Sequence, residues 1–199
     1  KERKQGKSNN NADNKTDAIL KHADIRRSLM NMKSIIEGQR SLAFWLSQQV
    51  DVSLNHPNKE IKKEAEEIVS LMTPVIKSFF SDSGMEITNE AIQVFGGYGY
   101  TKDQGIEQLY RDNRITPIYE GTNSVQAIDL VFRKVLNNKI LNKFIKIINN
   151  EIDNNQSNND LKNFSNILKK NVKTLTDFSN WLEEKNKNKK DDVSSACND

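Results

Sequence analysis

The 199-residue sequence contains little cysteine, proline or glycine. Aromatic residues make up only 7% of the sequence. Its one cysteine, Cys197, excludes an internal disulfide and fits a reducing, cytoplasmic location. No apolar run reaches the ~20 residues that a membrane-spanning helix needs, and no apolar segment follows the polar N-terminus. We therefore expect neither a membrane partner nor a secretory signal.

A strong charge of one sign is also lacking. Lys and Arg number 30 against 27 Asp and Glu, which leaves a net charge of +3. So small an excess does not favour binding to nucleic acid. His22, His56 and Cys197 do not have the spacing of metal ligands, so we expect no metal site. What remains is a polar chain, 35% hydrophobic and 29% charged, as is typical of long surface helices with solvated tails.

Apolar residues recur at helical spacing along most of the chain, with no alternation long enough for a sheet. Asp24 can N-cap a first helix of roughly 25 residues. Residues 55–58 break the pattern, and a second helix is expected from Lys59, with a kink at Pro74. Two long helices joined by a short turn predict an all-α fold built on an antiparallel helical bundle.

The two ends of the chain differ from this bundle. Residues 1–23 are almost without apolar residues and read as a polar leader or loop. Residues 137–199 are rich in Lys and Asn but keep the spacing of additional helices, with a charged break near residues 186–192. Trp181 lies on an apolar stripe there and is expected in the core. The division is therefore 1–23, a bundle over 24–136, and a further helical region over 137–199.

The glycines at positions 96, 97 and 99 stand out between Gln93 and Gln126. We expect them to end the second helix and to form a tight loop. Closely spaced glycines permit positive φ and let a ligand or another backbone approach. On pattern alone a helix C-cap and turn is the favoured interpretation, for which Gly96 would suffice. No strand precedes the glycines, so they are not a dinucleotide-binding fingerprint.

Glu120 is the second unusual residue in this stretch. A short helix is expected over 106–113, and residues 115–122 are expected to be irregular because Pro117 disfavours helix before it. Thr122 can N-cap the next helix. A carboxylate desolvated in such an apolar loop has a raised pKa and can act as a general base. On pattern alone, a surface glutamate or one paired with a neighbouring arginine is favoured.

The run from Ala91 to Gln126, AIQVFGGYGYTKDQGIEQLYRDNRITPIYEGTNSVQ, resembles the signature of the acyl-CoA dehydrogenase family's C-terminal helical domain. Its pieces AIQVFGGYGYT, LYRD and YEGT come in the family's order and spacing. The resemblance covers roughly residues 22–136 and is greatest to the longer branch of the family. That branch includes 3-methylmercaptopropionyl-CoA dehydrogenases and broad-specificity fatty-acyl-CoA dehydrogenases, and its members carry an extra helical region after the bundle.

The resemblance implies an FAD-dependent oxidation of an acyl-CoA to the trans-2-enoyl-CoA, as in fatty-acid β-oxidation. In the family the glutamate of YEGT, here Glu120, removes the α proton while the β hydride passes to the flavin. Its backbone N–H also polarises the thioester oxygen. By position, Gly121 would lie against the substrate, and Thr122 and Ser124 would contact the flavin nucleotide. Ser124 departs from the Gln or Glu of many members.

The resemblance also implies an assembly. Gln93, Gly96 and Gly97 would approach the FAD of a neighbouring subunit, because family sites are built across a dimer. We therefore expect a homodimer or homotetramer that passes electrons to electron-transfer flavoprotein or a similar acceptor.

The family's N-terminal helical domain and middle β-domain are not recognisable in this sequence, and the chain does not begin with Met. We therefore expect a C-terminal fragment that is inactive and binds FAD poorly by itself. The main alternative is a non-catalytic helical interaction module or a flavin-binding module of the same family, such as its DNA-associated branch. An acyl-CoA oxidase, an enzyme closely related to the dehydrogenases, is a further alternative.

Overall fold

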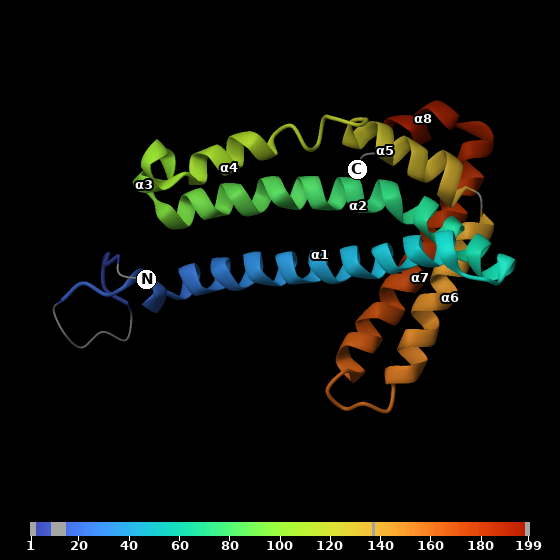
Figure 1. The fold of residues 1–199 in the computed structure, drawn as a ribbon, viewed down its shortest axis with the longest axis horizontal. Helices are drawn as coiled ribbons and strands as arrows, with labels where there is room; N and C mark the ends of the chain where they lie inside the picture. The colour runs from blue at the N-terminus through green and yellow to red at the C-terminus, as the bar shows by residue number, and fades with distance from the viewer. Residues whose placement is uncertain (1–2, 9–14, 137, 198–199) are drawn as a thin grey trace. The chain divides into compact units, whose positions relative to one another are not determined.

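The structure is a computed structural model that describes residues 3–8, 15–136 and 138–197 (Figure 1). Within these ranges the regular elements are helical and there is no strand, only an isolated antiparallel bridge between Lys4 and Ala18. The predicted all-α fold is confirmed. Over the same ranges, no helix combines the length and apolarity needed to cross a membrane.

Eleven helical elements follow one another along the described chain. They are η1 (Ile19–Lys21), α1 (Ala23–Asn55), α2 (Lys59–Phe95), α3 (Gly97–Tyr100), η2 (Lys102–Gln104), α4 (Ile106–Asn113), α5 (Asn123–Asp129), η3 (Leu130–Val135), α6 (Asn138–Asn155), α7 (Lys162–Asn188) and α8 (Lys190–Ser195).

Helices α1 and α2 are the two long helices that the apolar spacing predicts. Helix α1 begins at Ala23, one residue before the predicted cap, and its 33 residues exceed the predicted length. Helix α2 begins at Lys59 as predicted, because Asn58 Oδ1 accepts hydrogen bonds from the backbone N–H groups of Glu60 (2.8 Å) and Ile61 (3.3 Å). The helix continues through Pro74 to Phe95.

The chain divides into two compact units, which we describe separately. Unit 1 comprises residues 1–45 and 79–118, and unit 2 comprises residues 46–78 and 119–199. In unit 1 the first part of α1 lies antiparallel to the last part of α2 (Figure 1), and Gln39 Nε2 donates to Phe79 O at 3.4 Å. Helices α3 and α4 and the η2 turn pack against one another at the end of this pair.

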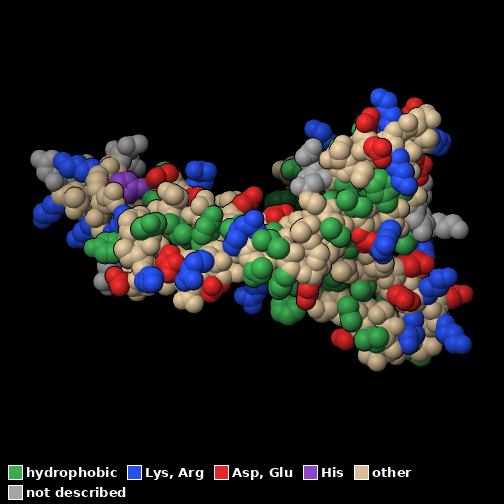
Figure 2. Space-filling model, turned by 90° about the horizontal axis from the view of Figure 1, so that it is seen from above, with side chains coloured by type: hydrophobic (Ala, Val, Ile, Leu, Met, Phe, Trp, Pro, Cys, Tyr) green, Lys and Arg blue, Asp and Glu red, His purple; other side chains and the backbone are tan. Residues whose placement is uncertain are grey.

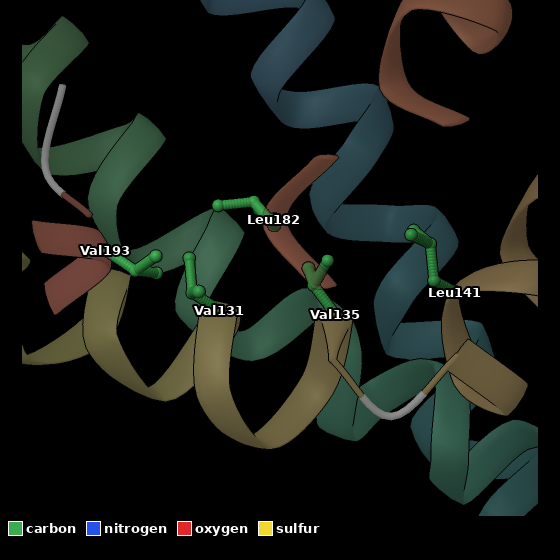
Figure 3. Close-up of a cluster of buried hydrophobic side chains, with 5 residues drawn as sticks. All are labelled: Val131, Val135, Leu141, Leu182 and Val193. Atoms are coloured by element: carbon green, nitrogen blue, oxygen red, sulfur yellow. The ribbon is translucent and has the colours of Figure 1, made fainter. Parts of the chain in front are cut away.

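Unit 2 has its own hydrophobic core, a cluster of five aliphatic side chains that come from four elements (Figure 3). Burying an aliphatic side chain of this size contributes about 1.5–3 kcal/mol, so the cluster is a main source of stability for this unit. It holds η3, α6, α7 and α8 together. Its members are Val131, Val135, Leu141, Leu182 and Val193.

Polar bonds tie the first half of α2 to the rest of unit 2. Lys143 forms an ion pair with Glu67, and hydrogen bonding to that carboxylate raises the pKa of Lys143. Lys134 Nζ donates to Ser70 Oγ at 2.6 Å. These bonds link η3 and α6 to a helix that is far from them in sequence.

The prediction that Trp181 belongs to the core is wrong. Trp181 is 47% exposed and stacks on Phe178, with ring centroids 5.6 Å apart. Helix α7 buries the face that carries Val172 and Leu182 instead, because that face meets α6 and the unit 2 core.

Figure 2 shows other hydrophobic side chains that also reach the surface among the charged ones. Helix α7 extends to Asn188, into the predicted break.

Candidate functional site

Glu120 has a backbone conformation that L-residues rarely adopt. Its φ is 54°, and within the described chain it is the one non-glycine residue with positive φ. Gly121 follows with a φ of 89°. The left-handed region costs a non-glycine residue about 1–2 kcal/mol. Strain of this kind persists only where neighbouring contacts maintain it, and it is concentrated at functional sites.

The first turn of α5 holds this segment in place. Thr122 N-caps α5 as predicted, with its Oγ1 accepting from the Val125 N–H at 3.3 Å. Gln126 Nε2 donates to Glu120 O at 3.1 Å. A Cβ on Gly121 would lie 3.2 Å from the same Nε2 atom, so a larger residue would press on this bond. The position of the Glu120 backbone is therefore set by local bonds to α5.

The Glu120 side chain is exposed, as is Tyr119 before it. Within the described residues its carboxylate has no hydrogen-bond or ion-pair partner. Arg111, one of the arginines near Glu120 in sequence, pairs instead with Glu107 (Arg111 Nε to Glu107 Oε2, 3.3 Å). An exposed, unpaired carboxylate on strained backbone is available to a ligand, but this chain does not itself provide the water-poor surroundings of an efficient base.

The glycine-rich segment in unit 1 is more helical than predicted. Helix α2 ends at Phe95, and Gly96 takes a φ of 63°. The residues after it form the short helix α3 rather than a loop, since Gly99 N–H donates back to Gly96 O at 2.8 Å. A single glycine with positive φ is thus enough to reverse the chain before the next helix begins.

The three glycines of this segment have different roles. A Cβ on Gly99 would lie 2.8 Å from both Ile92 O and Phe95 Cβ, so Gly99 is required for α3 to pack on the last turn of α2. Glycine is required at position 96 because the backbone there has a positive φ. Gly97 is exposed and has nothing within 4 Å of its added Cβ. The C-cap interpretation therefore accounts for Gly96 and close packing for Gly99, but neither accounts for Gly97.

Arg3 lies beside this turn, although it precedes Val94 by 91 residues. Its Nη1 donates to Val94 O at 3.3 Å and to Phe95 O. These are among the last carbonyls of α2, where the negative end of the helix dipole favours a cation. Arg3 Nη2 is 2.7 Å from the place that a Cβ on Gly96 would take. Nothing in the sequence pattern singled Arg3 out, because no local spacing connects it to the glycines.

A cavity of about 760 Å³ opens at the same end of unit 1. Its apolar lining includes Leu29, Val94 and Phe95, and Arg3 and Gln104 contribute polar groups. An apolar cavity with a few polar groups is the usual form of a small-molecule site. This one suits a ligand with a flat or aliphatic body and an anionic group that can meet the guanidinium.

The residues predicted for the site fall into two groups. Glu120, Gly121, Thr122 and Ser124 lie in unit 2, where Ser124 is exposed in the first turn of α5. The predicted cofactor residues of the glycine turn lie in unit 1, namely Gln93, Gly96 and Gly97. Gln93 is exposed near the end of α2.

Comparison with known proteins places this chain in a family. Residues 8–135 match the family described as acyl-CoA dehydrogenase, C-terminal domain. The chain is 39% identical over 118 residues to a 3-methylmercaptopropionyl-CoA dehydrogenase of Ruegeria pomeroyi, covering 59% of this chain and 20% of that protein.

Two further relatives show the same pattern. A broad-specificity linear acyl-CoA dehydrogenase of Mycobacterium tuberculosis is 37% identical over 122 residues, covering 61% of this chain and 20% of that protein. A butyryl-CoA dehydrogenase of Syntrophomonas wolfei is 35% identical over 116 residues, covering 58% of this chain and 19% of that protein. The matched part of the chain thus spans about a fifth of the length of these curated relatives.

Proposed function

The chain belongs to the acyl-CoA dehydrogenase family through its C-terminal helical domain, and from this we propose that it is part of an FAD-dependent enzyme that oxidises an acyl-CoA to the trans-2-enoyl-CoA. The observation that carries the proposal is the conformation of Glu120. A glutamate with a φ of 54° in the sequence YEGT is strained, held by α5 and open to a ligand. A plain helical linker has no need of such a residue.

In the proposed reaction Glu120 has two tasks. Its carboxylate takes the proton from the carbon α to the thioester, and its backbone N–H donates a hydrogen bond to the thioester oxygen as negative charge builds there. FAD, when bound, supplies the acceptor for the hydride that leaves the β carbon. The bond from Gln126 to Glu120 O and the cap at Thr122 keep both groups of Glu120 in position.

The residues of the glycine turn fit a flavin nucleotide. Gly97 leaves open space where any other residue would place a side chain, and Arg3 brings a guanidinium next to Gly96. We propose that Gln93, Gly96 and Gly97 approach the FAD of a neighbouring subunit in a homodimer or homotetramer. Thr122 and Ser124, at the start of α5, would contact the flavin nucleotide, and Gly121 would lie against the acyl-CoA.

The exposed Glu120 carboxylate sets a requirement for activity. A weak base removes a proton from a weak carbon acid only where water is excluded. Since this chain leaves Glu120 exposed, the bound substrate and the rest of the enzyme must cover it. We therefore propose that the 199-residue chain by itself binds FAD poorly and turns over nothing, and that the reduced flavin of the full-length protein is reoxidised by electron-transfer flavoprotein or a similar acceptor.

The decisive experiment is flavin absorbance of the full-length protein under anaerobic conditions, on addition of a panel of acyl-CoAs. The panel should include 3-methylmercaptopropionyl-CoA, butyryl-CoA and longer linear acyl-CoAs. We expect bleaching by one class, which would identify the substrate class as well. A flavin spectrum that no acyl-CoA changes would favour a non-catalytic flavin-binding module, and a protein without flavin would favour a helical interaction module.

A further inference from the structure

The described residues before α1 form two paired arms in unit 1. These arms are residues 3–8 and 15–22, and backbone bonds join them. Gln5 N–H donates to Asp17 O, and Asp17 N–H donates to Gly6 O, both at 2.9 Å. Ile19 N–H donates to Arg3 O at 3.0 Å. The second arm leads directly into α1, so these bonds anchor the first arm to the helical pair.

Asp17 makes several of the contacts between the two arms. It is only 6% exposed, which is unusual for a carboxylate. Its Oδ2 accepts from both the backbone N–H of Ser8 (2.9 Å) and Ser8 Oγ (2.7 Å), and its Oδ1 pairs with Lys21 Nζ at 3.1 Å. The hydrogen bonds from Ser8 lower the pKa of Asp17 below its ordinary value of 3.8, so the side chain is ionised at neutral pH. Charge-assisted bonds of this kind are among the stronger ones available to a loop.

A second tether comes from the end of η1. His22 Nε2 lies 2.7 Å from Gln5 O. Because a carbonyl oxygen can only accept, this bond requires a hydrogen on Nε2. Gly6 takes a φ of 64° in the turn between these contacts, and its missing Cβ would sit 3.6 Å from His22 Cε1. Asp17 and His22 thus hold the first arm at two points.

The first arm ends at Arg3, which meets the carbonyls of Val94 and Phe95 beside Gly96. An arm without tethers would lose conformational entropy each time it placed Arg3 there. Because the tethers already order the arm, little further conformational entropy is lost when Arg3 takes this position. Preorganised binding sites gain affinity in the same way.

We propose that Asp17 is a positioning residue for the flavin site, which holds Arg3 against the end of α2 beside Gly96 without touching the cofactor itself. This rests on the proposed function, since it assumes that FAD binds at the glycine turn. It goes beyond the motif, because Asp17 lies far in sequence from every residue of that turn.

The test is a double-mutant cycle in the full-length protein, with the dissociation constant of FAD as the readout. We expect Asp17→Ala and Arg3→Ala each to weaken FAD binding by about tenfold. If Asp17 acts through Arg3, the double variant will bind FAD no worse than Arg3→Ala alone. The control is Asp24→Ala, which removes an exposed carboxylate from the first turn of α1 and should leave the dissociation constant unchanged.

The outcomes separate the two proposals. Wild-type protein that binds no FAD would overturn the proposed function. Wild-type protein that binds FAD, with an unchanged dissociation constant in Asp17→Ala, would overturn only the positioning role. Fully additive losses in the double variant would do the same, because general destabilisation does not act through Arg3. Should Asp17→Ala fail to fold, Asp17→Asn keeps one acceptor oxygen. It is expected to bind FAD less tightly than wild type, and tight binding would count against the proposal.

Discussion

In the turn after α2 the positive φ falls on Gly96, whereas in the segment before α5 it falls on Glu120 as well as on Gly121. Glycine adopts this conformation without strain, and a glutamate does not. The first segment therefore has glycine, the residue type that this φ favours, at position 96. The second segment has a glutamate at position 120, where a positive φ is unfavourable. A strained glutamate at a position where glycine would fit better supports the role proposed for its side chain.

The first segment contains a second contrast, between Gly97 and Gly99. Gly99 has no room for a Cβ, while Gly97 has open space around it. Gly99 is thus needed for packing within this chain. No contact within the described residues requires a glycine at position 97. The predictions below test both contrasts.

The largest effect is expected from Glu120→Gln in the full-length protein. It removes the proposed base but keeps the shape and the backbone N–H, so turnover should fall by about 10³-fold or more while FAD stays bound. Steady-state kinetics with the acyl-CoA that bleaches the flavin would measure it. A variant that retains wild-type turnover would refute the assignment of Glu120 as the base.

Gly99→Ala should destabilise the chain. The added methyl group would lie 2.8 Å from the backbone of Ile92, which cannot move away without distorting α2. Overpacking of this kind costs about 2 kcal/mol. Urea unfolding followed by circular dichroism would measure the loss, and an unchanged midpoint would mean that α3 does not pack on α2 as described.

Thr122→Ala should remove the side-chain cap of α5. Its Oγ1 accepts from Val125 N–H, and loss of such a cap costs about 1 kcal/mol. Thr122→Ser is the matched control, because serine keeps the acceptor oxygen. Equal unfolding midpoints for the alanine and serine variants would show that the cap contributes nothing.

Glu120→Gly should stabilise the chain, because glycine removes the strain at this position. The gain in unfolding free energy is expected to be about 0.5 kcal/mol, since the greater freedom of glycine in the unfolded chain offsets part of it. The same substitution should abolish turnover of the full-length protein. A loss of stability would show that the Glu120 side chain supports the fold.

Gly97→Ala should have the smallest effect on stability, within about 0.5 kcal/mol. Its added methyl group meets nothing within 4 Å. In the full-length protein, however, the same methyl group should weaken FAD binding, because it fills the space proposed for the cofactor. Titration of the apoprotein with FAD checks this, and unchanged affinity would remove Gly97 from the proposed site.

Local signals predicted several helix boundaries well. Helix α2 starts at Lys59 after an asparagine cap, α4 spans Ile106–Asn113 after Gly105, and Thr122 caps α5. Each boundary depends on a residue within three or four positions of it, so the sequence pattern contains the necessary information. The motif around Glu120 was equally visible, because its parts lie close together in the chain.

Other features did not follow from local pattern. Helix α3 replaces a predicted loop because Gly99 can approach α2 closely, and Trp181 is exposed because α7 buries a different face. Apolar spacing shows that a helix has a hydrophobic side but not which neighbour will cover it.

The sequence by itself determined the helical class, the breaks at glycine and proline, and the family motif that points to Glu120, since these depend on residues that are neighbours in the chain. Only the tertiary structure decided that Glu120 is strained, that Gly99 but not Gly97 is needed for packing, and that Arg3 reaches the end of α2. The last contact joins residues 91 positions apart, and such a contact exists only when the whole unit has folded.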